Sequence, residues 1–599
     1  MSVLIDELNK NQREAVLAVD GPSMVLAGAG SGKTRVLVTK VIHMITVRQI
    51  PPEQIVMITF TNKAAREMKE RIASVLGTEG KISLGYIGTF HSFCCRNLRK
   101  DGPHIGLDRS FTIFDSDDQL AIIKKALKKL DAGKLTPAYF LNRISDAKNQ
   151  LIPPDRFLEV YSFYRAPEVA EVYETYQNEL RKNNGVDFDD LIMLCVQLFM
   201  KHPAVLDDYQ ERYRYLLVDE FQDTNYAQYV LTRMLASKYR NITAVGDFSQ
   251  SIYSWRGADI RNLEKFSSDF AGSRVVYLEE NYRSTQKILD FAYETISKNT
   301  GHPILKLVTS NEEGEDIIIY DADNEEEEAR YVARQIASEL ELGLSYADMA
   351  VLYRTNAQSR AIEESFLHHG IPYTLIGGVR FYERKEIKDI LSYLRLFVNP
   401  ADEISAERII KMGKRRWNVF KEFHTKLQDR WRDYSTSELI KRIYDATGYL
   451  KQYDPDVEED YVRLENLREL QSVAHTFPDP VTFLEQVALV ESEYSEGEKR
   501  GKSADGVRLM TMHQAKGLEF PVVFIVGLEE GILPHSRSID DVQQLEEERR
   551  LFYVAITRAM KRLYLTYARR RFIFGRRIER LKSRFIRTPA DDYDEGYYL

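Results

Sequence analysis

Short runs of apolar residues, bounded by turn-forming residues, recur along the chain and predict buried strands. The first four are SMVLAG (23–28), QIVMITF (54–60), YLLVDE (215–220) and NITAVGD (241–247). Six more follow, namely RVVYLEE (274–280), DIIIY (316–320), MAVLYR (349–354), VRLMTMH (507–513), PVVFIVG (521–527) and RLYLTYA (562–568). These runs are rich in Val, Ile and Leu, which is typical of parallel strands covered on both faces. The two sets therefore predict two α/β sheets.

Within each set of strands, one long polar stretch without a strand pattern interrupts the series. One covers residues 111–203, and the other covers 380–503 and is rich in Lys, Glu, Arg and Tyr. We interpret both as mostly helical insertions. The predicted organisation is a first core (1–110 and 204–280) interrupted by the insertion 111–203, and a second core (281–379 and 504–599) interrupted by the insertion 380–503.

The first apolar run leads directly into a glycine-rich loop and then into a helical pattern. The loop reads AGAGSGKT and consists of Ala27, Gly28, Ala29, Gly30, Ser31, Gly32, Lys33 and Thr34. In a strand–loop–helix context the glycines let backbone N–H groups converge on phosphates, and the helix N-terminus adds a favourable dipole. Lys33 is expected to reach the β- and γ-phosphates of a nucleotide, and Thr34 to bind Mg²⁺. The usual first Gly is replaced by Ala27.

A second apolar run ends in two adjacent acids. The segment LLVDEFQDTN (216–225) places Asp219 and Glu220 after the predicted strand. Asp219 is suited to hold Mg²⁺ and Glu220 to activate water. An ordinary Asp-Glu turn at a strand end is the alternative for these two residues alone. Together with the glycine-rich loop, they predict nucleotide hydrolysis.

Length and charge refine this picture. A chain of 599 residues with 44% hydrophobic, 29% charged and 11% aromatic residues is expected to form several globular domains. The net charge of −8 opposes nucleic-acid binding by the chain as a whole. However, residues 568–587 are densely basic, whereas 323–328 and the final DDYDEGYYL are acidic. Because local charge matters more than the sum, a basic track remains compatible with the composition.

Signals for targeting are absent from the sequence pattern. No run of 18 apolar residues occurs, and MSVLIDELNKNQ lacks the pattern of a signal peptide. The three cysteines, Cys94, Cys95 and Cys195, fit no metal-ligand spacing. We therefore expect a cytoplasmic protein that contacts no membrane.

Five further segments follow the glycine-rich loop in a fixed order. They are VDEFQDTN, VGDFSQSIYSWRGA, LEENYRST, TMHQAKGLEF and EERRLFYVAITRAM. From LNKNQREAV near the start to SRF (583–585), this series closely resembles superfamily 1 DNA helicases of the UvrD/Rep/PcrA group. The resemblance implies an α/β fold of two RecA-like P-loop NTPase cores with parallel sheets, each carrying a mostly helical insertion. It also implies 3′ to 5′ movement on single-stranded DNA, with ATP and Mg²⁺ as cofactors.

The resemblance also implies roles for individual residues at the nucleotide. They are the adenine-reading Gln12, the adenine-stacking Tyr282, the ribose-contacting Glu519, the pocket-lining Arg35, the γ-phosphate sensor Gln250, and the arginine fingers Arg283 and Arg558. Guanidinium groups suit the fingers because they stabilise charge on the transferred phosphate. A solvated glutamine at a helix start is the alternative for Gln12. The roles of Phe248 and Ser249 stay open, because relatives more often show a more acidic run there.

A track for single-stranded DNA needs aromatic faces for bases and polar or basic donors for phosphates. By resemblance the stacking residues are Phe60, Tyr253 and Trp255. The expected phosphate contacts are Thr61, Asn62, Thr89, His91, Arg256, Arg354, Asn356 and His513. A core role for Phe60 and structural hydrogen bonds for His91 and His513 are the alternatives.

Two features of the second half of the chain concern the duplex. The segment LYLTYARRRFIFGRRIER predicts a strand, a basic turn and a return strand, and in relatives a hairpin here carries an aromatic that props open the duplex junction. Phe574 is our candidate for this separation pin, with a merely solvated basic hairpin as the alternative. In RIIKMGKRRWNVF, Gly413 is present, but Arg415, Arg416 and Trp417 replace an expected Gly-Ile-Gly. Duplex contact by the second insertion is therefore left open.

These features together predict an ATP-dependent 3′ to 5′ DNA helicase and single-stranded DNA translocase that acts in repair or replication. The expected partners are single-stranded DNA, single/double-strand junctions, and repair or replication proteins. We expect a monomer in solution and leave a dimer on DNA open. A translocase that mainly displaces proteins, with little unwinding as a monomer, is the first alternative. A nucleotide-regulated binding protein without turnover is the second.

Overall fold

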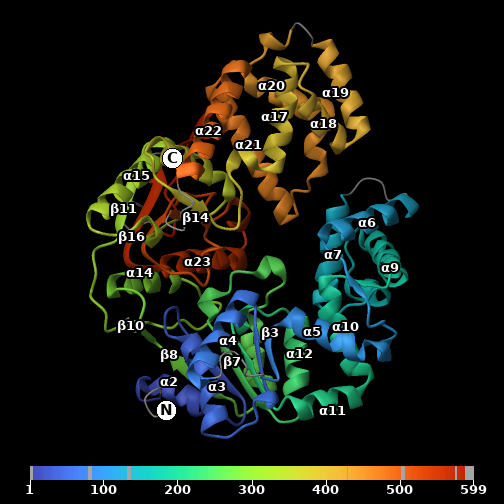
Figure 1. Cartoon of the computed structure of the whole chain (residues 1–599), viewed down its shortest axis with the longest axis vertical. Helices are drawn as coiled ribbons and strands as arrows, with labels where there is room; N and C mark the ends of the chain where they lie inside the picture. The colour runs from blue at the N-terminus through green and yellow to red at the C-terminus, as the bar shows by residue number, and fades with distance from the viewer. Residues whose placement is uncertain are drawn as a thin grey trace. The chain divides into compact units, whose positions relative to one another are not determined.

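The computed structural model describes residues 5–77, 84–130, 136–427, 430–500, 506–573 and 576–586. The chain divides into two compact units (Figure 1). Unit 1 comprises Met1–Arg283 and His302–Ser310, and unit 2 comprises Ser284–Gly301 and Asn311–Leu599. Each unit contains a six-stranded parallel sheet, as continuous apolar runs predict.

The sheet of unit 1 has the strand order β3-β2-β6-β7-β1-β8, and all neighbouring strands are parallel. Its strands are β1 (Ser23–Ala27), β2 (Ile55–Thr59), β3 (Tyr86–Thr89), β6 (Tyr215–Val218), β7 (Asn241–Gly246) and β8 (Arg274–Leu278). Every residue of β1 and β2 is buried, because apolar clusters lie on both faces of the sheet. In a parallel sheet all carboxyl ends share one edge, where ligands bind.

Helices cover this sheet. They are α2 (Lys10–Leu17), α3 (Lys33–Thr46), α4 (Asn62–Leu76), α5 (Phe90–Asp101), α10 (Phe188–Lys201), α11 (Pro203–Arg212), α12 (Tyr226–Ala236) and α13 (Arg261–Asp269). Between α5 and α10 the chain forms β4 (Thr112–Ile113), α6 (Ser116–Leu130), α7 (Pro137–Asn149), α8 (Phe157–Val160), α9 (Ala166–Lys182) and β5 (Gly185–Val186). The helices of this segment pack around their own apolar cluster, which includes Phe140, Tyr173 and Tyr176.

One buried ion-pair network ties this helical segment to α10. Lys148 Nζ of α7 lies 2.6 Å from Asp187 and 2.8 Å from Asp190, and all three side chains are nearly inaccessible. Burial alone would lower the pKa of Lys148, but the two carboxylates raise it above its usual value. Tyr176 donates a further hydrogen bond to Asp187 at 2.8 Å. A buried charge is tolerated when it is paired and hydrogen-bonded in this way.

The sheet of unit 2 has the strand order β11-β16-β15-β12-β14-β13 and is also parallel throughout. Its strands are β11 (Ile318–Ala322), β12 (Met349–Tyr353), β13 (Tyr373–Leu375), β14 (Val507–Thr511), β15 (Phe520–Ile525) and β16 (Ala559–Ala568). The helices α14 (Gln286–Ile296), α15 (Glu325–Glu341), α16 (Ser359–His368) and α23 (Val542–Ile556) belong to the same unit.

A second helical segment lies between β13 and β14. It contains α17 (Lys385–Val398), α18 (Glu403–Met412), α19 (Lys414–Lys426), α20 (Thr436–Thr447), α21 (Glu458–Thr476) and α22 (Pro480–Arg500), and it has its own apolar cluster. The antiparallel hairpin β17 (Arg570–Ile573) and β18 (Arg576–Glu579) follows β16. The short strands β9 (Glu280–Asn281) and β10 (Val308–Thr309) pair within unit 1.

The predicted strands are found, with one correction of their grouping. RVVYLEE, grouped with the second set of runs although the predicted first core extends to residue 280, forms β8 and pairs with β1 in the sheet of unit 1. Two strands of the six-stranded sheets, β3 and β13, are not predicted, nor are the two-residue strands β4, β5, β9 and β10. Tyr86–Thr89 contains a glycine and is short, and Tyr373–Leu375 is only partly buried.

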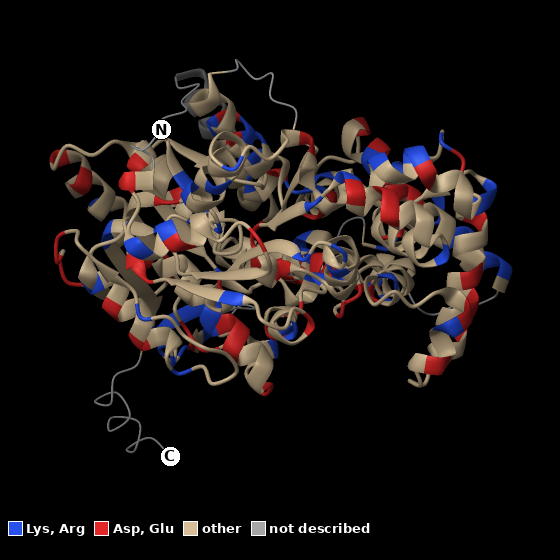
Figure 2. Ribbon diagram, turned by 90° about the horizontal axis from the view of Figure 1, so that it is seen from below, with Lys and Arg blue, Asp and Glu red and all other residues tan. Residues whose placement is uncertain are grey.

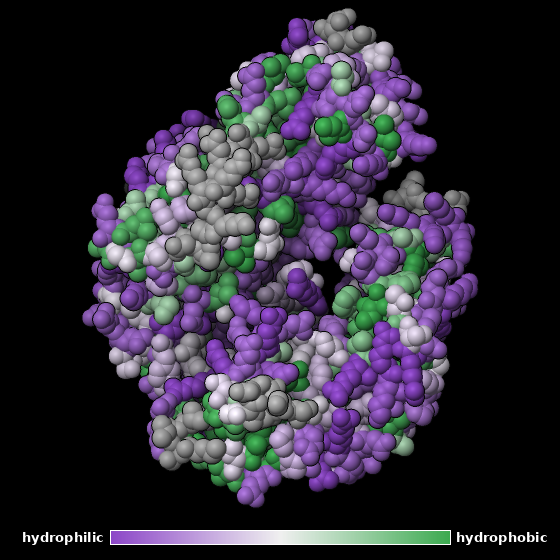
Figure 3. Space-filling model, in the orientation of Figure 1, coloured by the Kyte–Doolittle hydropathy of each residue, from purple (hydrophilic) through white to green (hydrophobic). Residues whose placement is uncertain are grey.

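The described residues are mixed in charge (Figure 2), and the face drawn in Figure 3 is mostly hydrophilic. Lys and Arg alternate with Asp and Glu along both units (Figure 2), and the visible face in Figure 3 shows hydrophobic residues only in scattered patches. Among the described residues, no helix has the length and apolar character needed to span a membrane.

Candidate nucleotide and DNA site

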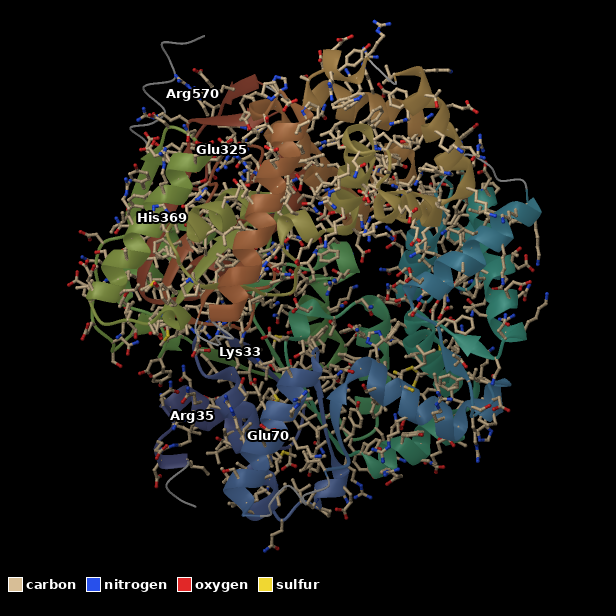
Figure 4. The ribbon with its side chains drawn as sticks, turned by 45° about the horizontal axis from the view of Figure 1, so that its top comes forward. Lys33, Arg35, Glu70, Glu325, His369 and Arg570 are labelled. Carbon is tan, nitrogen blue, oxygen red and sulfur yellow. The ribbon has the colours of Figure 1, made fainter. Side chains whose placement is uncertain are left out.

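The glycine-rich loop connects β1 to α3 at the carboxyl edge of the sheet in unit 1. Gly30 and Gly32 have positive φ angles of 68° and 84°, which other residues adopt only with strain. Among the described residues no side chain caps the N-terminus of α3, and N–H groups at such an end are suited to bind an anion. Lys33 and Arg35 lie in the first turn of this helix (Figure 4). The geometry is that of a phosphate-binding loop.

The predicted catalytic lysine and acid meet at this edge. Lys33 Nζ lies 3.7 Å from Glu220 Oε1. The same Nζ is buried and makes no hydrogen bond with the described residues. Asp219 directly follows β6 and donates its backbone N–H to the carbonyl of Ile58. A cation held beside a carboxylate, with donors unused, is suited to receive phosphate oxygens.

The expected adenine-side residues also cluster. Gln12 is fully buried and donates to the carbonyl of Ser31 at 2.9 Å, and its oxygen accepts the N–H of Asn9. Asn9 also donates to the hydroxyl of Tyr282 at 2.8 Å and to Glu280 at 2.9 Å. Burial, followed by the hydrogen bond to Glu280, raises the pKa of Tyr282. In this structure the Gln12 amide thus holds α2 against the phosphate-binding loop, and it is not a solvated side chain.

One buried amide that the sequence reasoning missed links this loop to Arg283. Asn281 donates to the carbonyl of Ala29 at 2.7 Å, and its oxygen accepts the N–H of Arg283 at 2.8 Å. A Cβ at Gly30 would lie only 2.5 Å from the Asn281 amide and 2.7 Å from Arg283. The motif LEENYRST contains this residue, but nothing in the sequence distinguishes it from its neighbours.

The predicted sensor Gln250 lies in a turn after β7. Its amide donates to Asp247 Oδ2 at 2.7 Å. The backbone N–H of Asp247 donates in turn to the side-chain oxygen of Gln222 at 3.0 Å, and Gln222 donates to Glu220 at 2.5 Å. Gln222 was also missed by the sequence reasoning, although it lies in the DEFQ segment.

Unit 2 holds Arg558 and the segment of Glu519 side by side. The guanidinium of Arg558 donates to the carbonyls of Val554 at 2.9 Å and Leu518 at 3.2 Å, and to the Thr557 hydroxyl at 3.0 Å. The carbonyl of Arg558 accepts the N–H of Phe520. These contacts fix the orientation of Arg558 within its own unit.

Comparisons of the sequence with known proteins find matches along nearly the whole chain. Residues 8–271 match the UvrD/REP helicase N-terminal domain, and residues 276–419 and 415–570 match the UvrD-like helicase C-terminal domain. The "ATP-dependent DNA helicase PcrA" of Bacillus subtilis (strain 168) is 44% identical over 99% of this chain and 87% of its own length. The proteins of the same name from Staphylococcus aureus (strain Mu50) and Staphylococcus epidermidis (strain RP62A) are 41% and 40% identical, over 100% and 99% of this chain and 88% and 87% of their own lengths.

The chain belongs to the UvrD/Rep helicase family. The family that the motif series indicates is therefore confirmed. The two parallel α/β sheets agree with the RecA-like cores expected of a UvrD/Rep helicase.

The DNA-stacking residues expected in a UvrD/Rep helicase lie beyond β7 in unit 1. Trp255 is 46% exposed, and the Arg256 guanidinium lies 4.4 Å from the centre of its ring. Tyr253 packs edge-on against Trp255 at 6.4 Å. An exposed tryptophan with an adjacent arginine offers a stacking face and a cation together. The structure thus brings these three predicted residues into one cluster.

The other expected DNA residues of unit 1 follow β2 and β3 at the carboxyl edge of the sheet. Phe60 is partly buried and packs edge-on against Phe90 at 5.8 Å, so part of its ring serves the core. Thr61 and Thr89 cap the helices α4 and α5, and Asn62 is the first residue of α4. His91 packs against Phe188, and burial lowers its pKa. A neutral imidazole there can still donate a hydrogen bond.

In unit 2 one expected phosphate contact has a different environment. Arg354 forms a bidentate ion pair with Glu548, with Nη2–Oε1 at 2.7 Å, and Glu548 also accepts the N–H of His535. Burial opposes the charge of Arg354, but Glu548 raises its pKa above the usual value. Asn356 begins a short 3₁₀ helix, and His513 lies two residues beyond β14. In this structure the guanidinium of Arg354 is thus committed to Glu548.

The predicted basic hairpin exists as β17–β18, but Phe574 lies outside the described residues. The base of the hairpin is anchored by Arg571, which donates to Glu529 and Glu328 at distances from 2.6 to 2.9 Å. The N–H of Phe572 donates to Glu325, at the start of α15; Figure 4 labels Glu325 and Arg570. A cavity of about 470 Å³ lies between this hairpin, α15, α16, α21 and α22.

Proposed function

We propose that this chain is an ATP-dependent DNA helicase that moves 3′ to 5′ along single-stranded DNA and separates the strands of duplex DNA. The observation that carries the proposal is the Lys33–Glu220 pair in a phosphate-binding loop, with the exposed Trp255 following a strand of the same sheet. Relatives that are 40–44% identical over almost the whole chain carry the name ATP-dependent DNA helicase.

The residues of unit 1 fit a magnesium nucleotide. The N–H groups of the first turn of α3, which no described side chain caps, and Lys33 Nζ, which makes no hydrogen bond with the described residues, suit the phosphates. Thr34 and Asp219 are the proposed Mg²⁺ ligands, because both offer oxygen atoms at the carboxyl edge of the sheet, where Thr34 lies in the first turn of α3 and Asp219 follows β6. When bound, Mg²⁺ neutralises charge on the β- and γ-phosphates. Gln12, Tyr282 and Arg35 are proposed to hold the base and line the pocket.

The catalytic roles follow from the chemistry of the side chains. Glu220 orients the attacking water and accepts its proton. Gln250 contacts the γ-phosphate through its amide, and Arg283 donates to the same group from its place beside Gly30. Arg558 and Glu519, which are adjacent in unit 2, are proposed to serve as the second arginine finger and the ribose contact. Planar guanidinium donors stabilise charge that develops on equatorial oxygens.

Coupling to DNA is proposed to run through the stacking cluster. Bases stack on Tyr253, Trp255 and the exposed part of Phe60, while Arg256 and His91 contact phosphates. Thr61, Asn62, Thr89, Asn356 and His513 are the further proposed phosphate contacts, and Phe574 is the proposed separation pin. We also propose the division into two motor cores (1–110 with 204–280, and 281–379 with 504–599) and two insertions (111–203 and 380–503); it differs from the two compact units in assigning 281–283 and 302–310 to the second core.

Hydrolysis is tested by Glu220→Gln in the full chain. Without the carboxylate to accept the proton of water, DNA-stimulated ATP turnover should fall by about 10²–10⁴-fold. Affinity for single-stranded DNA should stay within about 2-fold, because Glu220 is not in the stacking cluster. Glu70→Gln, an exposed acid of α4 (Figure 4), is the control. Unchanged turnover in Glu220→Gln would remove Glu220 from its role and support nucleotide binding without hydrolysis.

Strand separation is tested on duplexes with a 3′ or a 5′ single-stranded tail. The proposal expects ATP-dependent unwinding of the 3′-tailed duplex alone. Displacement of a DNA-bound protein without unwinding would favour the translocase alternative. We further propose that the protein works in DNA repair or replication in the cytoplasm, as a monomer in solution, and that loading by repair or replication proteins directs it to junctions.

A further inference from the structure

A buried glutamine lies between the proposed catalytic acid and the turn that holds Gln250. Gln222 is fully buried, one residue beyond the aromatic Phe221 in the 3₁₀ turn that follows β6. Its amide nitrogen donates to Glu220 Oε2 at 2.5 Å, and its amide oxygen accepts the N–H of Asp247 at 3.0 Å. These two bonds fix the orientation of the amide, because an exchange of oxygen and nitrogen would place donor against donor and acceptor against acceptor.

The backbone conformation of two residues beside this amide, Gly246 and Glu220, is consistent with a fixed amide position. A Cβ at Gly246 would lie 2.8 Å from the Gln222 oxygen, so the last residue of β7 leaves room for it. Glu220 has a φ angle of 49°, in the left-handed region that non-glycine residues adopt at a cost. Such strain persists where the surroundings hold the residue, and it is concentrated at functional sites. The bond from Gln222 is one of the interactions that hold Glu220 there.

A continuous series of polar contacts therefore runs across the carboxyl edge of unit 1. Gln250 donates to Asp247, Asp247 donates through its N–H to Gln222, and Gln222 donates to Glu220. The other carboxylate oxygen of Glu220 faces Lys33 at 3.7 Å. The proposed γ-phosphate sensor and the proposed catalytic acid are thus joined through one side chain.

We propose that Gln222 is a positioning residue that fixes the Glu220 carboxylate for the attacking water and makes its placement depend on the Gln250 turn. This inference rests on the proposed function, since it assigns Gln222 a role only through Glu220. A glutamine is required because one terminal amide must both donate to a carboxylate and accept from a backbone N–H. When a nucleotide draws Gln250 toward its γ-phosphate, the change at Asp247 reaches Glu220 through the Gln222 amide.

The first test replaces the amide with an apolar side chain of similar length. In the full chain, Gln222→Met should lower kcat for DNA-stimulated ATP hydrolysis by about 10–100-fold, part of what a general base supplies. KM for ATP and the affinity for single-stranded DNA should stay within about 3-fold, because Gln222 contacts neither ligand. Gln210→Met is the matched control. Gln210 is a buried amide with bonds to Met234 and Ser237, and its replacement should leave kcat unchanged.

The second test asks whether the effect passes through Glu220. Glu220→Gln and Gln222→Met are combined, and the double variant should be no slower than Glu220→Gln alone, because residues that act as a unit are not additive. Additive losses would overturn the positioning role. Full kcat in Gln222→Met would overturn it also, while the low turnover of Glu220→Gln would leave the proposed function standing. Full turnover in Glu220→Gln would instead contradict the proposed function itself.

A third variant keeps Gln222 and changes only the position of its side-chain amide. Gly246→Ala puts a methyl group against the amide oxygen, and the end of a flexible side chain can yield without unfolding the strand. We expect kcat to fall, as in Gln222→Met, while KM for ATP and the melting temperature stay close to those of the wild type. If Gln222→Met lowers the melting temperature while the folded variant keeps the kcat of the wild type, the inference is contradicted and Gln222 has only a packing role.

Discussion

At the residue scale, the ion pair of Arg354 and Glu548 occupies a guanidinium that the motif series assigns to the DNA track. The motif series suggests that Arg354 contacts a phosphate, yet its guanidinium makes a bidentate pair with Glu548 inside unit 2. The side chains are only 13% and 7% exposed. Removing one partner of such a pair leaves the other charge buried and uncompensated.

Arg354→Met should therefore destabilise the protein more than it weakens DNA binding. We expect the free energy of unfolding to fall by about 3–5 kcal/mol, the usual cost of breaking a buried pair. Arg569→Met, which breaks the exposed pair with Asp321, should cost about 0–1 kcal/mol. Urea unfolding of the two variants gives the comparison. A stable Arg354→Met protein with strongly reduced affinity for single-stranded DNA would instead place Arg354 on the phosphate track.

Some site residues could be predicted from the sequence and others could not. Lys33 and Glu220 were predicted because a phosphate-binding loop and a strand-end acid have local signatures, and the structure brings them together. Gln222 and Asn281 have no such signature. Their roles come from partners on segments distant in the sequence, Asp247 for the one and Ala29 for the other.

At the element scale, a single lysine joins α2 to α3. Lys40 Nζ of α3 donates to the carbonyls of Ala15 at 3.1 Å and Ala18 at 2.5 Å, at the C-terminal end of α2. Those carbonyls have no partner within the helix itself. Burial, together with Arg274, lowers the pKa of Lys40 to about 7, and Asp20 opposes this only weakly. A neutral amine has two N–H donors, which matches the two carbonyls.

The low pKa of Lys40 gives unfolding a pH dependence with a definite sign. Between pH 7 and about 10.5 the unfolded chain keeps this proton while the folded chain has lost it, so stability rises with pH by about 1.4 kcal/mol per unit. Lys40→Met should remove that rise. Urea unfolding at pH 7, 8 and 9 measures it as the difference between wild type and variant. Lys124→Met, on the exposed side of α6, should keep the wild-type slope. Parallel slopes for wild type and Lys40→Met would contradict the prediction.

Elements were predicted to the extent that burial leaves a continuous apolar signal. β1, β2, β6 and β7 are buried over most of their length, so their runs stand out in the sequence. The partner of a strand leaves no such signal. RVVYLEE is grouped with the second set of apolar runs by its place in the chain, whereas the predicted core boundary at residue 280 assigns it to the first core, and it pairs with β1. Pairing depends on the topology of the whole unit and not on the local pattern.

At the scale of the whole molecule, the residues proposed for hydrolysis are distributed over both units. Lys33, Glu220 and Arg283 belong to unit 1, and Arg558 belongs to unit 2. The hydrogen bonds of Arg558 to Val554 and Leu518 mean that its removal would disturb unit 2 itself, so a substitution that keeps the charge is the better probe.

Arg558→Lys should lower DNA-stimulated ATP turnover by about 10³-fold, because lysine cannot reproduce the planar donors of an arginine finger. Nucleotide affinity should change by less than about 3-fold, since the phosphate-binding loop is intact. Arg562→Lys, at an ion pair with Glu315 elsewhere in unit 2, is the control. Steady-state hydrolysis and nucleotide titration measure the two effects. Turnover within about 3-fold of the wild type would exclude Arg558 as a finger.

The chain passes between the units at three peptide bonds, 283–284, 301–302 and 310–311. α14 lies between the first two, yet it belongs to unit 2, where Ser284 donates to the carbonyl of Ala559 and Asn299 to that of Glu546. A protease that nicks the exposed stretch 311–313 would thus yield an N-terminal fragment that still carries α14. The two fragments should co-elute under native conditions and come apart only in denaturant.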